Sequence, residues 1–233
     1  MKTLNYSLGR NTYDNEPTQL TALDFDDFIV QISRTGSKRK GEFYICSPLQ
    51  SGLHDDPVKY PGLNNWRLKR LALTRQFLAL DADYFNSPND FVSFRQRVGQ
   101  WNALVYTTAS HTPQVPRARA IIELDQLVDS KTGEDLGDAL QRQIEATLGS
   151  ANIKLDPSVY LASQPIYTPL ISSQTYRTYG SSLDVQATLS AWPAPVAQSV
   201  PSLQKLGHLP PVGSSPNMAA IVLPQENPTE IAK

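Results

Sequence analysis

The sequence has few of the residues that mark a disulfide-bonded, zinc-binding or strongly basic protein. Of its 233 residues, one is cysteine and three are histidine. Cys46 alone cannot form an internal disulfide, and histidines at positions 54, 111 and 208 do not have the spacing of a zinc finger. Lys and Arg number 21 against 22 Asp and Glu, so the formal net charge is −1 and any nucleic-acid site must be local. A reducing cytoplasm is the expected compartment.

Long hydrophobic runs are also missing. No stretch approaches the roughly 18 apolar residues of a membrane span, and the first residues, MKTLNYSLGRNTYDNE, lack the apolar segment of a signal peptide. We therefore expect no membrane partner. The hydrophobic content of 40% is sufficient for the core of one large domain.

Hydrophobic spacing predicts alternating helices and strands. Helical periodicity occurs in residues 23–33, 89–101 and 133–149, and Gly149 is well placed to end the last helix. Strand-like runs occupy residues 76–85, 103–110 and 117–124, the last two forming an expected hairpin around the polar loop HTPQVP. Residues 41–67 are rich in Pro, Gly, Asn and Asp, so we expect an irregular exposed connection containing one short strand, EFYIC.

The composition changes after Trp192, where a segment rich in proline and without periodicity begins. A Pro-rich segment sustains neither a helix nor a central strand. We therefore expect an ordered domain over residues 1–190 and a linker or tail over residues 191–233, which can lead to another domain in a longer protein.

Two acids mark the end of the strand predicted at residues 76–85. Asp81 and Asp83 are two residues apart, so their side chains lie on the same face of a strand and can share a cation. A hard divalent ion such as Mg²⁺ or Mn²⁺ relieves the repulsion between two such carboxylates. The alternative interpretation is a strand end with solvated acids.

A second group surrounds the expected hairpin, where Ser110, His111, Arg117 and Arg119 collect a hydroxyl, an imidazole and two guanidinium groups. Arginines two apart on a strand share a face, and their planar side chains hold phosphate oxygens bidentately, so the group suits a polyphosphate. The alternatives are a surface cross-strand salt bridge for Arg119 and a turn residue bonded to the backbone for His111.

Two further features are weaker on their own. Asp156 precedes a proline and by itself indicates a turn or a helix N-cap. The basic run at residues 66–75 provides candidate contacts to nucleic acid, although a solvated strand or helix edge is an equal alternative; its members are Arg67, Lys69, Arg70 and Arg75.

The order FLALDADYF, helix, VYTTASHTPQVPRARAIIEL, helix, KLDPSVYLASQPIYTP resembles the archaeo-eukaryotic primase superfamily over roughly residues 40–180. It is most similar to the primase domains of plasmid, phage and integrative-element replication proteins. The resemblance implies an α/β (α+β) fold, in which a small N-terminal α/β unit joins a mostly antiparallel sheet with packed helices. It also implies a DNA primase or primase-polymerase that uses Mg²⁺ or Mn²⁺.

Carried over residue by residue, the resemblance makes Asp81, Asp83 and Asp156 the metal-binding catalytic acids. The middle motif departs from the family pattern, because Ser110 and His111 are adjacent instead of forming Ser-x-His. Whether His111, Arg117 or Arg119 contacts the triphosphate therefore stays open. The implied partners are a single-stranded DNA template, nucleoside triphosphates and a replicative helicase.

The implied reaction is attack of a 3′-hydroxyl on the α-phosphate of a nucleoside triphosphate, assisted by two metal ions. Two alternatives remain from the sequence. A metal-dependent nuclease or relaxase also gathers carboxylates and histidine, but only His111 lies near the acids here. A catalytically inert DNA-binding module of a replication initiator would not require the three acids.

Overall fold

The computed structural model describes residues 3–34 and 41–193. Chain contacts divide the protein into units at 1–195 and 196–233, and every described residue belongs to the first unit. Of the tail expected at residues 191–233, all but the first three residues lie outside the described part, so that expectation and the 1–190 boundary stay predictions. Within the described residues, no helix has the length and apolar character needed to cross a membrane.

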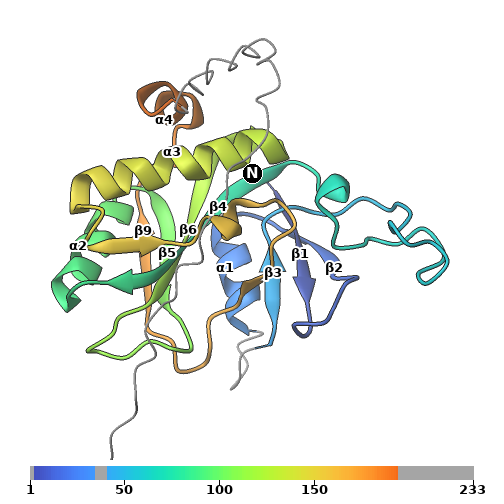
Figure 1. The fold of residues 1–233 in the computed structure, drawn as a ribbon, viewed down its shortest axis with the longest axis horizontal. Coiled ribbons are helices and arrows are strands. Elements are labelled where there is room, and N and C mark those ends of the chain that lie inside the picture. The colour runs from blue at the N-terminus through green and yellow to red at the C-terminus, as the bar shows by residue number, and fades with distance from the viewer. Residues whose placement is uncertain (1–2, 35–40, 194–233) are drawn as a thin grey trace, which may run out of the picture. The chain divides into compact units, whose positions relative to one another are not determined.

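The larger of two antiparallel sheets has five strands in the order β7-β4-β6-β5-β9 (Figure 1). Its strands are β4 (Arg75–Phe85), β5 (Asn102–Thr107), β6 (Ala118–Val128), β7 (Ile153–Leu155) and β9 (Thr175–Tyr179). The expected hairpin is confirmed, since β5 and β6 pair directly with Ala103 opposite Ile122 and Thr107 opposite Ala118. The short strand β7 pairs with β4, and the long helix at Ser130–Leu148 connects β6 to β7.

The second sheet has four strands in the order β2-β1-β3-β8. Its strands are β1 (Leu4–Gly9), β2 (Thr18–Ala22), β3 (Phe43–Ile45) and β8 (Ile166–Tyr167). The strand expected at EFYIC is confirmed as β3. β8 comes from far along the chain and pairs Tyr167 with Phe43, so it joins the segment around residue 167 to this four-stranded sheet, which we call the N-terminal sheet.

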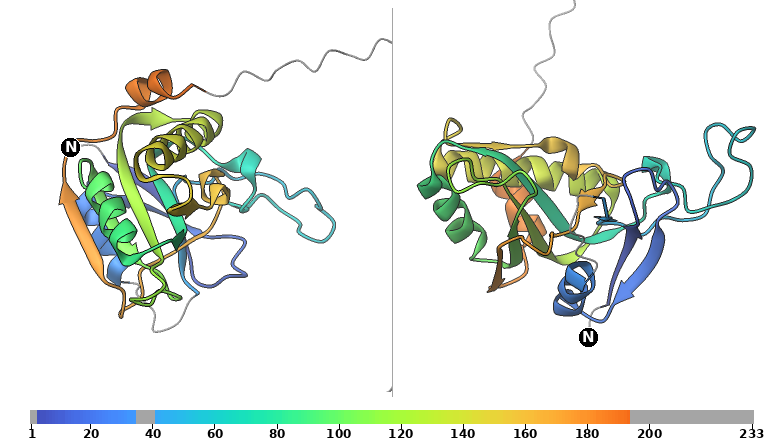
Figure 2. Two further views of the ribbon diagram at one scale, coloured as in Figure 1. Left: turned by 60° about the vertical axis from the view of Figure 1, so that its left-hand side comes forward. Right: turned by 90° about the horizontal axis from the view of Figure 1, so that it is seen from below.

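Three helices alternate with the strands of the five-stranded sheet along the chain and pack against one of its faces (Figure 2). They are α2 (Pro88–Val98), α3 (Ser130–Leu148) and α4 (Val185–Ala191). Side-chain caps begin each of them: Ser87, Asp129 and Asp184 accept a hydrogen bond from a backbone N–H in the first turn. Gly149, with φ of 87°, ends α3 as predicted.

The opposite face of the five-stranded sheet packs against the four-stranded sheet and α1 (Phe25–Arg34). Successive side chains of β4 divide between the two cores: Leu78 and Leu80 face α2 and α3, whereas Phe77 and Ala79 face the N-terminal sheet. The Phe28 ring lies 4.3 Å from the Phe77 ring between their centroids. Since β4 is buried on both faces, its register is strongly specified.

The residues between β3 and β4 include an irregular excursion, residues 50–66, that we call the arm. Bridges between Gly52 and Asn64 and between Leu49 and Ala72 close its base. Figures 1 and 2 show it projecting away from both sheets in every view. The expectation of an irregular connection at residues 41–67 is therefore confirmed, apart from β3.

The helices and strands expected from periodicity are all present, and the α+β fold class is confirmed. Several elements had no prediction because they are short or carry mixed polar sequence: the β1–β2 hairpin, β7, β8, β9 and α4. β9 reads TYRTY, in which no side chain is fully buried, so alternation gives little signal.

The structure corrects the assignment of Arg75 to DNA binding. Its side chain is 1% exposed, beneath α3, and its guanidinium donates to the backbone carbonyl of Tyr160 at 2.7 Å. Burial lowers the pKa of this guanidinium, whereas nearby acids act in the opposite direction. A side chain enclosed in this way cannot reach the phosphates of a nucleic acid.

Gly137 allows α3 to approach Tyr160 closely, because a Cβ at position 137 would lie 2.3 Å from Cγ of that tyrosine ring. We expect Gly137→Ala to lower the free energy of unfolding by about 1–3 kcal/mol, as overpacking does. Urea denaturation followed by circular dichroism measures this change. The control is Asp138→Ala, an exposed position of the same helix where a change within about 0.5 kcal/mol is expected. A Gly137→Ala protein as stable as wild type would contradict the close packing.

Candidate functional site

The three predicted acids lie close together, two on β4 and one directly after the adjacent strand β7. Asp81 and Asp83 occupy alternate positions near the end of β4. Asp156 follows β7, and its backbone N–H donates to the carbonyl oxygen of Asp81 at 2.9 Å. The pairing of β7 with β4 thus brings together residues that are 75 positions apart in the sequence.

Asp81 is buried and forms an ion pair with Arg119, which is its direct cross-strand partner on β6. Both hydrogen bonds of this pair go to one oxygen: Nε and Nη2 of Arg119 donate to Oδ2 of Asp81 at 2.9 and 2.5 Å. The other oxygen, Oδ1, is buried and has no hydrogen-bond partner among the described residues. An unsatisfied buried carboxylate oxygen is costly, so it identifies a position where a ligand would be stabilising.

The pKa of Asp81 also indicates that a cation would be stabilising at these acids. Burial raises the pKa of Asp81; Arg119 opposes this increase, while Asp83 and Asp156 add to it by repulsion. For Arg119, burial lowers the pKa, but Tyr106 and Asp81 outweigh it and the net direction is upward. Arg119 is therefore charged, and one arginine only partly offsets the repulsion among three carboxylates.

Carboxylate oxygens are suitable ligands for a hard divalent cation, although the side chains are not arranged as a complete set of metal ligands. Within the described residues, no three His, Cys, Asp or Glu side chains are grouped closely enough to hold a metal ion. Both oxygens of Asp156 accept hydrogen bonds from Ser158, at 2.9 Å from its N–H and 2.7 Å from its hydroxyl. The oxygens most available to a cation are therefore Oδ1 of Asp81 and the half-exposed carboxylate of Asp83.

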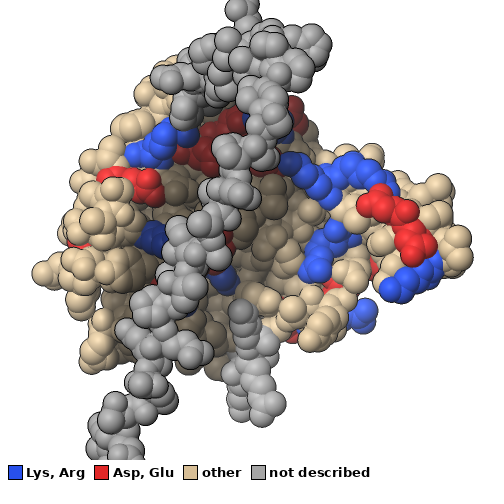
Figure 3. Space-filling model, in the orientation of Figure 1, with Lys and Arg blue, Asp and Glu red and all other residues tan. Residues whose placement is uncertain are grey.

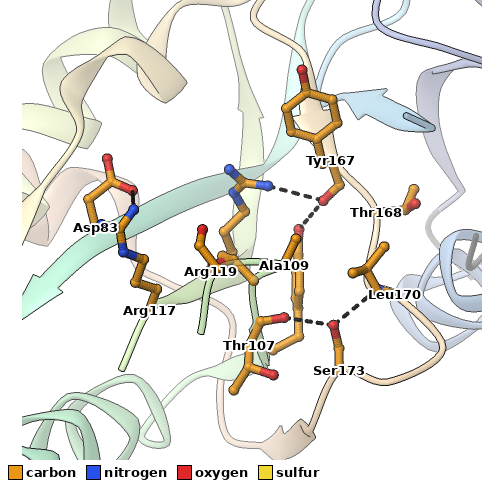
Figure 4. A pocket seen from close by; sticks show the side chains of 12 residues that line it. Asp83, Thr107, Ala109, Arg117, Arg119, Tyr167, Thr168, Leu170 and Ser173 are labelled. Carbon is orange, nitrogen blue, oxygen red and sulfur yellow. Dashed lines mark hydrogen bonds and ion pairs between the residues drawn. The ribbon is translucent and has the colours of Figure 1, made fainter. Parts of the chain in front are cut away.

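A pocket of about 130 Å³ opens beside these acids (Figure 4). Its lining includes predicted residues from the acid pair and the hairpin, together with residues of the segment around β8: Asp83, Ser110, Arg117, Arg119, Tyr167, Thr168 and Ser173. Figure 4 shows Arg117 and Asp83 on one side of the pocket and Thr168 and Ser173 on the other. The structure thus brings three of the four predicted phosphate-binding residues to one cavity.

The two arginines of the pocket have different surroundings. Arg117 lies 4.0 Å from Asp83 across the pair of atoms Nη1 and Oδ1, and both side chains are substantially exposed, at 39% and 50%. Arg119 is more enclosed: besides Asp81, its Nη1 donates to the carbonyl of Tyr167 at 3.4 Å. Arg117 is therefore the freer of the two to bind an anion, and Arg119 orients Asp81.

His111 does not line the pocket. The ring Nδ1 of His111 accepts the backbone N–H of Arg117 at 3.2 Å, and the backbone N–H of His111 donates to the carbonyl of Thr108 at 3.0 Å. The ring also packs 5.8 Å from the Phe91 ring. These contacts are the ones expected from the alternative interpretation, in which His111 is a turn residue bonded to the backbone. His111 therefore stabilises the loop that carries Ser110.

The remaining residues of the basic run are engaged within the protein. Lys69 pairs with Glu134 at 2.8 Å, and Arg70 pairs with Asp55 at 2.7 Å. Arg67 donates through Nη2 to the side-chain oxygen of Asn15 at 3.1 Å. These contacts are on or near the surface and can be exchanged for phosphate contacts, so DNA binding by Arg67, Lys69 and Arg70 stays a prediction.

Sequence reasoning missed Tyr106, Thr168 and Ser173. The hydroxyl of Tyr106 donates to the Tyr167 carbonyl at 2.7 Å, and the hydroxyl of Ser173 donates to the Thr107 carbonyl at 2.7 Å. These residues close the pocket on the side of the N-terminal sheet. They carry no motif, because their meeting depends on contacts between β5 and the distant segment around β8.

The VapE N-terminal domain family matches residues 63–189, which include the acids and the hairpin. The chain belongs to this family. A comparison with curated proteins found no match. The resemblance to the primase superfamily that the motifs indicated is supported by this membership, because the VapE N-terminal domain occurs in phage and plasmid replication.

Two solved structures are similar to this VapE N-terminal domain. One is the primase-polymerase domain (AEP domain) of cyanophage S-2L, with 11% identity, a TM-score of 0.44, and coverage of 82% of this chain and 89% of that chain. The other is the polymerase domain of Mycobacterium tuberculosis ligase D in complex with DNA, with 12% identity, a TM-score of 0.41, and coverage of 81% and 70%. At these identities no residue role is carried over, so the chemistry rests on the side chains of this chain.

Burial lowers the pKa of His111, which sets a pH dependence of folding. Below the ordinary histidine value of about 6.5, the unfolded chain binds the proton more readily than the folded chain, so stability falls as the pH falls. We expect the Tm of wild type to drop more between pH 7 and pH 5 than the Tm of His111→Gln, as measured by calorimetry. Parallel curves for the two proteins would contradict this role of His111.

Proposed function

We propose that this VapE N-terminal domain is a template-directed nucleotidyltransferase, a primase or primase-polymerase that acts in the replication of a mobile element. One observation carries the proposal: Asp83, Arg117 and Arg119 line one pocket, and Arg119 bonds one oxygen of the buried Asp81 while the other oxygen has no partner among the described residues. Carboxylates for a cation next to guanidinium groups for an anion suit a metal-bound nucleoside triphosphate.

In this proposal, Asp81 and Asp83 hold Mg²⁺ or Mn²⁺, and Asp156 joins them by exchanging its bonds to Ser158. When bound, the metal ions would neutralise charge on the triphosphate and on the attacking 3′-hydroxyl. Arg119 keeps one oxygen of Asp81 fixed, so that the other oxygen is directed away from it. Arg119 is therefore a positioning residue for Asp81 in addition to lining the pocket.

Arg117 and Ser110 contact the phosphates in this proposal. A guanidinium group donates two parallel hydrogen bonds to phosphate oxygens, and its charge is permanent. A 3′-hydroxyl held near Asp83 would lose its proton to solvent water as its oxygen forms a bond to the α-phosphorus. The bond from that phosphorus to the leaving pyrophosphate breaks in the same step, and Arg117 offsets charge on the leaving group.

The partners follow from this chemistry as part of the proposal: a single-stranded DNA template, nucleoside triphosphates and a replicative helicase. Arg67, Lys69 and Arg70 are candidate template contacts. A metal-dependent nuclease would use the same acids but has less need of two arginines that line the adjacent pocket. An inert DNA-binding module gains nothing from an unsatisfied buried carboxylate oxygen, which lowers stability.

Asp83→Asn tests the role of the acids without disturbing the buried ion pair. We expect primer extension on a single-stranded template with Mg²⁺ or Mn²⁺ to fall to about one hundredth of wild type or less. The Tm should stay close to wild type because Asp83 is half-exposed and its ion pair is long. The matched control is Asp26→Asn, an exposed acid paired with Arg177, which should extend normally. Normal extension by Asp83→Asn would refute the metal assignment.

Arg117→Lys tests how the triphosphate is held, since lysine keeps the charge but loses the bidentate geometry. We expect the KM for nucleotide to rise about tenfold while template affinity is unchanged. Steady-state extension on one template at fixed metal concentration measures this, with Arg142→Lys on α3 as the control. If Arg117→Lys has the wild-type KM and His111→Ala does not, the histidine holds the triphosphate instead.

A further inference from the structure

A second hollow lies between the β1–β2 turn and the arm, apart from the site described above. Its volume is about 590 Å³, and its lining includes Arg10, Tyr13, Asp14, Tyr60 and Trp66. We call it the aromatic groove. All of these residues except Trp66 lie outside residues 63–189, the part that matches the VapE N-terminal domain.

A stiff cluster of rings forms one wall of the aromatic groove. Tyr60 packs against His54 at 4.2 Å and against Trp66 at 5.5 Å between ring centroids, and His54 packs against Trp66 at 5.2 Å. The ammonium of Lys59 lies 5.0 Å from the centroid of the Tyr60 ring. The arm therefore holds Tyr60 in place with a cation beside it, the combination that binds unpaired bases next to a phosphate backbone.

Tyr13, on the β1–β2 turn, also lines the aromatic groove and is 87% exposed. The turn that carries it is ordered by side-chain bonds: Asn11 accepts the N–H of Tyr13 at 2.9 Å, and Asp14 accepts the N–H groups of Arg10 and Glu16 at 3.0 and 3.1 Å. The Tyr13 ring contributes little burial to the fold. A fixed turn that leaves a large ring in water indicates a binding role for that ring.

Arg67 connects the aromatic groove to the nucleotide pocket. Its N–H and guanidinium donate to the backbone and side-chain oxygens of Asn15 at 2.8 and 3.1 Å, and its guanidinium lies 5.3 Å from the Phe43 ring. Phe43 is the cross-strand partner of Tyr167, which lines the pocket and bonds Arg119. Arg67 thus contacts both Asn15, which lines the groove, and Phe43, which pairs with a residue of the pocket, so a DNA template could follow it from one site to the other.

We propose that the aromatic groove binds unpaired bases of the single-stranded template by stacking them on Tyr13 and Tyr60. This inference rests on the proposed function, whose template it locates. The lining carries one base and two acids, since Arg10 lies 3.7 Å from Asp14 and Glu16 adds a second acid, and Lys59 beside Tyr60 offsets the excess negative charge. Figure 3 likewise shows basic and acidic patches interspersed over the arm side of this face. Affinity from this groove thus comes mainly from stacking, which requires single-stranded bases.

The test measures binding of a fluorescein-labelled single-stranded oligothymidylate to the full chain by anisotropy, without metal or nucleotide. We expect Tyr13→Ala to raise the Kd about tenfold, the effect of losing one stacked base. The control is Tyr179→Ala, which removes another exposed tyrosine, 76% exposed, from the edge strand β9. The control should bind as wild type, and both variants should keep the wild-type Tm.

Salt dependence and crosslinking separate stacking from phosphate contact. Plots of log Kd against log salt should run parallel for wild type and Tyr13→Ala, whereas Arg67→Ala should lower the slope by about one. Photocrosslinking with an oligonucleotide that carries 5-iododeoxyuridine should give peptides containing Tyr13 or Tyr60 by mass spectrometry.

Three results would overturn the inference: wild-type affinity of Tyr13→Ala, equal competition by double-stranded DNA, or crosslinks confined to other peptides. If Tyr13→Ala binds the oligonucleotide as wild type does but no longer binds a protein partner, the groove is a site for that partner and not for DNA. Because binding is measured without transfer, the proposed function can fail separately. Tyr13-dependent binding by a chain that never extends a primer would support a single-stranded DNA site and refute the transferase.

Discussion

The site depends on the buried ion pair between Asp81 and Arg119 across β4 and β6. A buried ion pair contributes little net stability, but removal of one partner leaves an uncompensated charge and is strongly destabilising. Here the arginine bonds one carboxylate oxygen and leaves the other unpartnered. The pair therefore fixes the direction of the oxygen that is available to a cation, and it places a positive charge beside the pocket.

The pair can exist because the register of β4 is set by burial on both faces. Leu80 and Ala82 belong to the core under α2 and α3, and Ala79 belongs to the core over α1. A shift of one residue would place Asp81 in the helical core and remove its contact with Arg119. The apolar residues next to Asp81 in the strand thus position the acids of the site.

The pocket and the aromatic groove divide two physical tasks between charge and stacking. The pocket concentrates ionised groups where water is partly excluded, which strengthens their interaction with phosphate and metal. The groove presents the rings of Tyr13 and Tyr60, which suit bases of any sequence. Both lie beside the N-terminal sheet, whose strand β8 also carries Tyr167 into the pocket. The proposed binding of nucleic acid would thus rest on local features of a chain whose net charge is −1.

The sequence by itself determined the elements whose signals are local: β4, the β5–β6 hairpin, the helices α1 to α3, and the shared face of Asp81 and Asp83. Hydrophobic periodicity and helix caps depend on residues a few positions apart, so they can be recognised without knowledge of the fold. Only the tertiary structure decided that Asp156 lies beside Asp81, that Arg75 is buried under α3, and that His111 bonds to its own loop. Those outcomes depend on which distant segments pack together and exclude water, and local periodicity carries no information about that pairing.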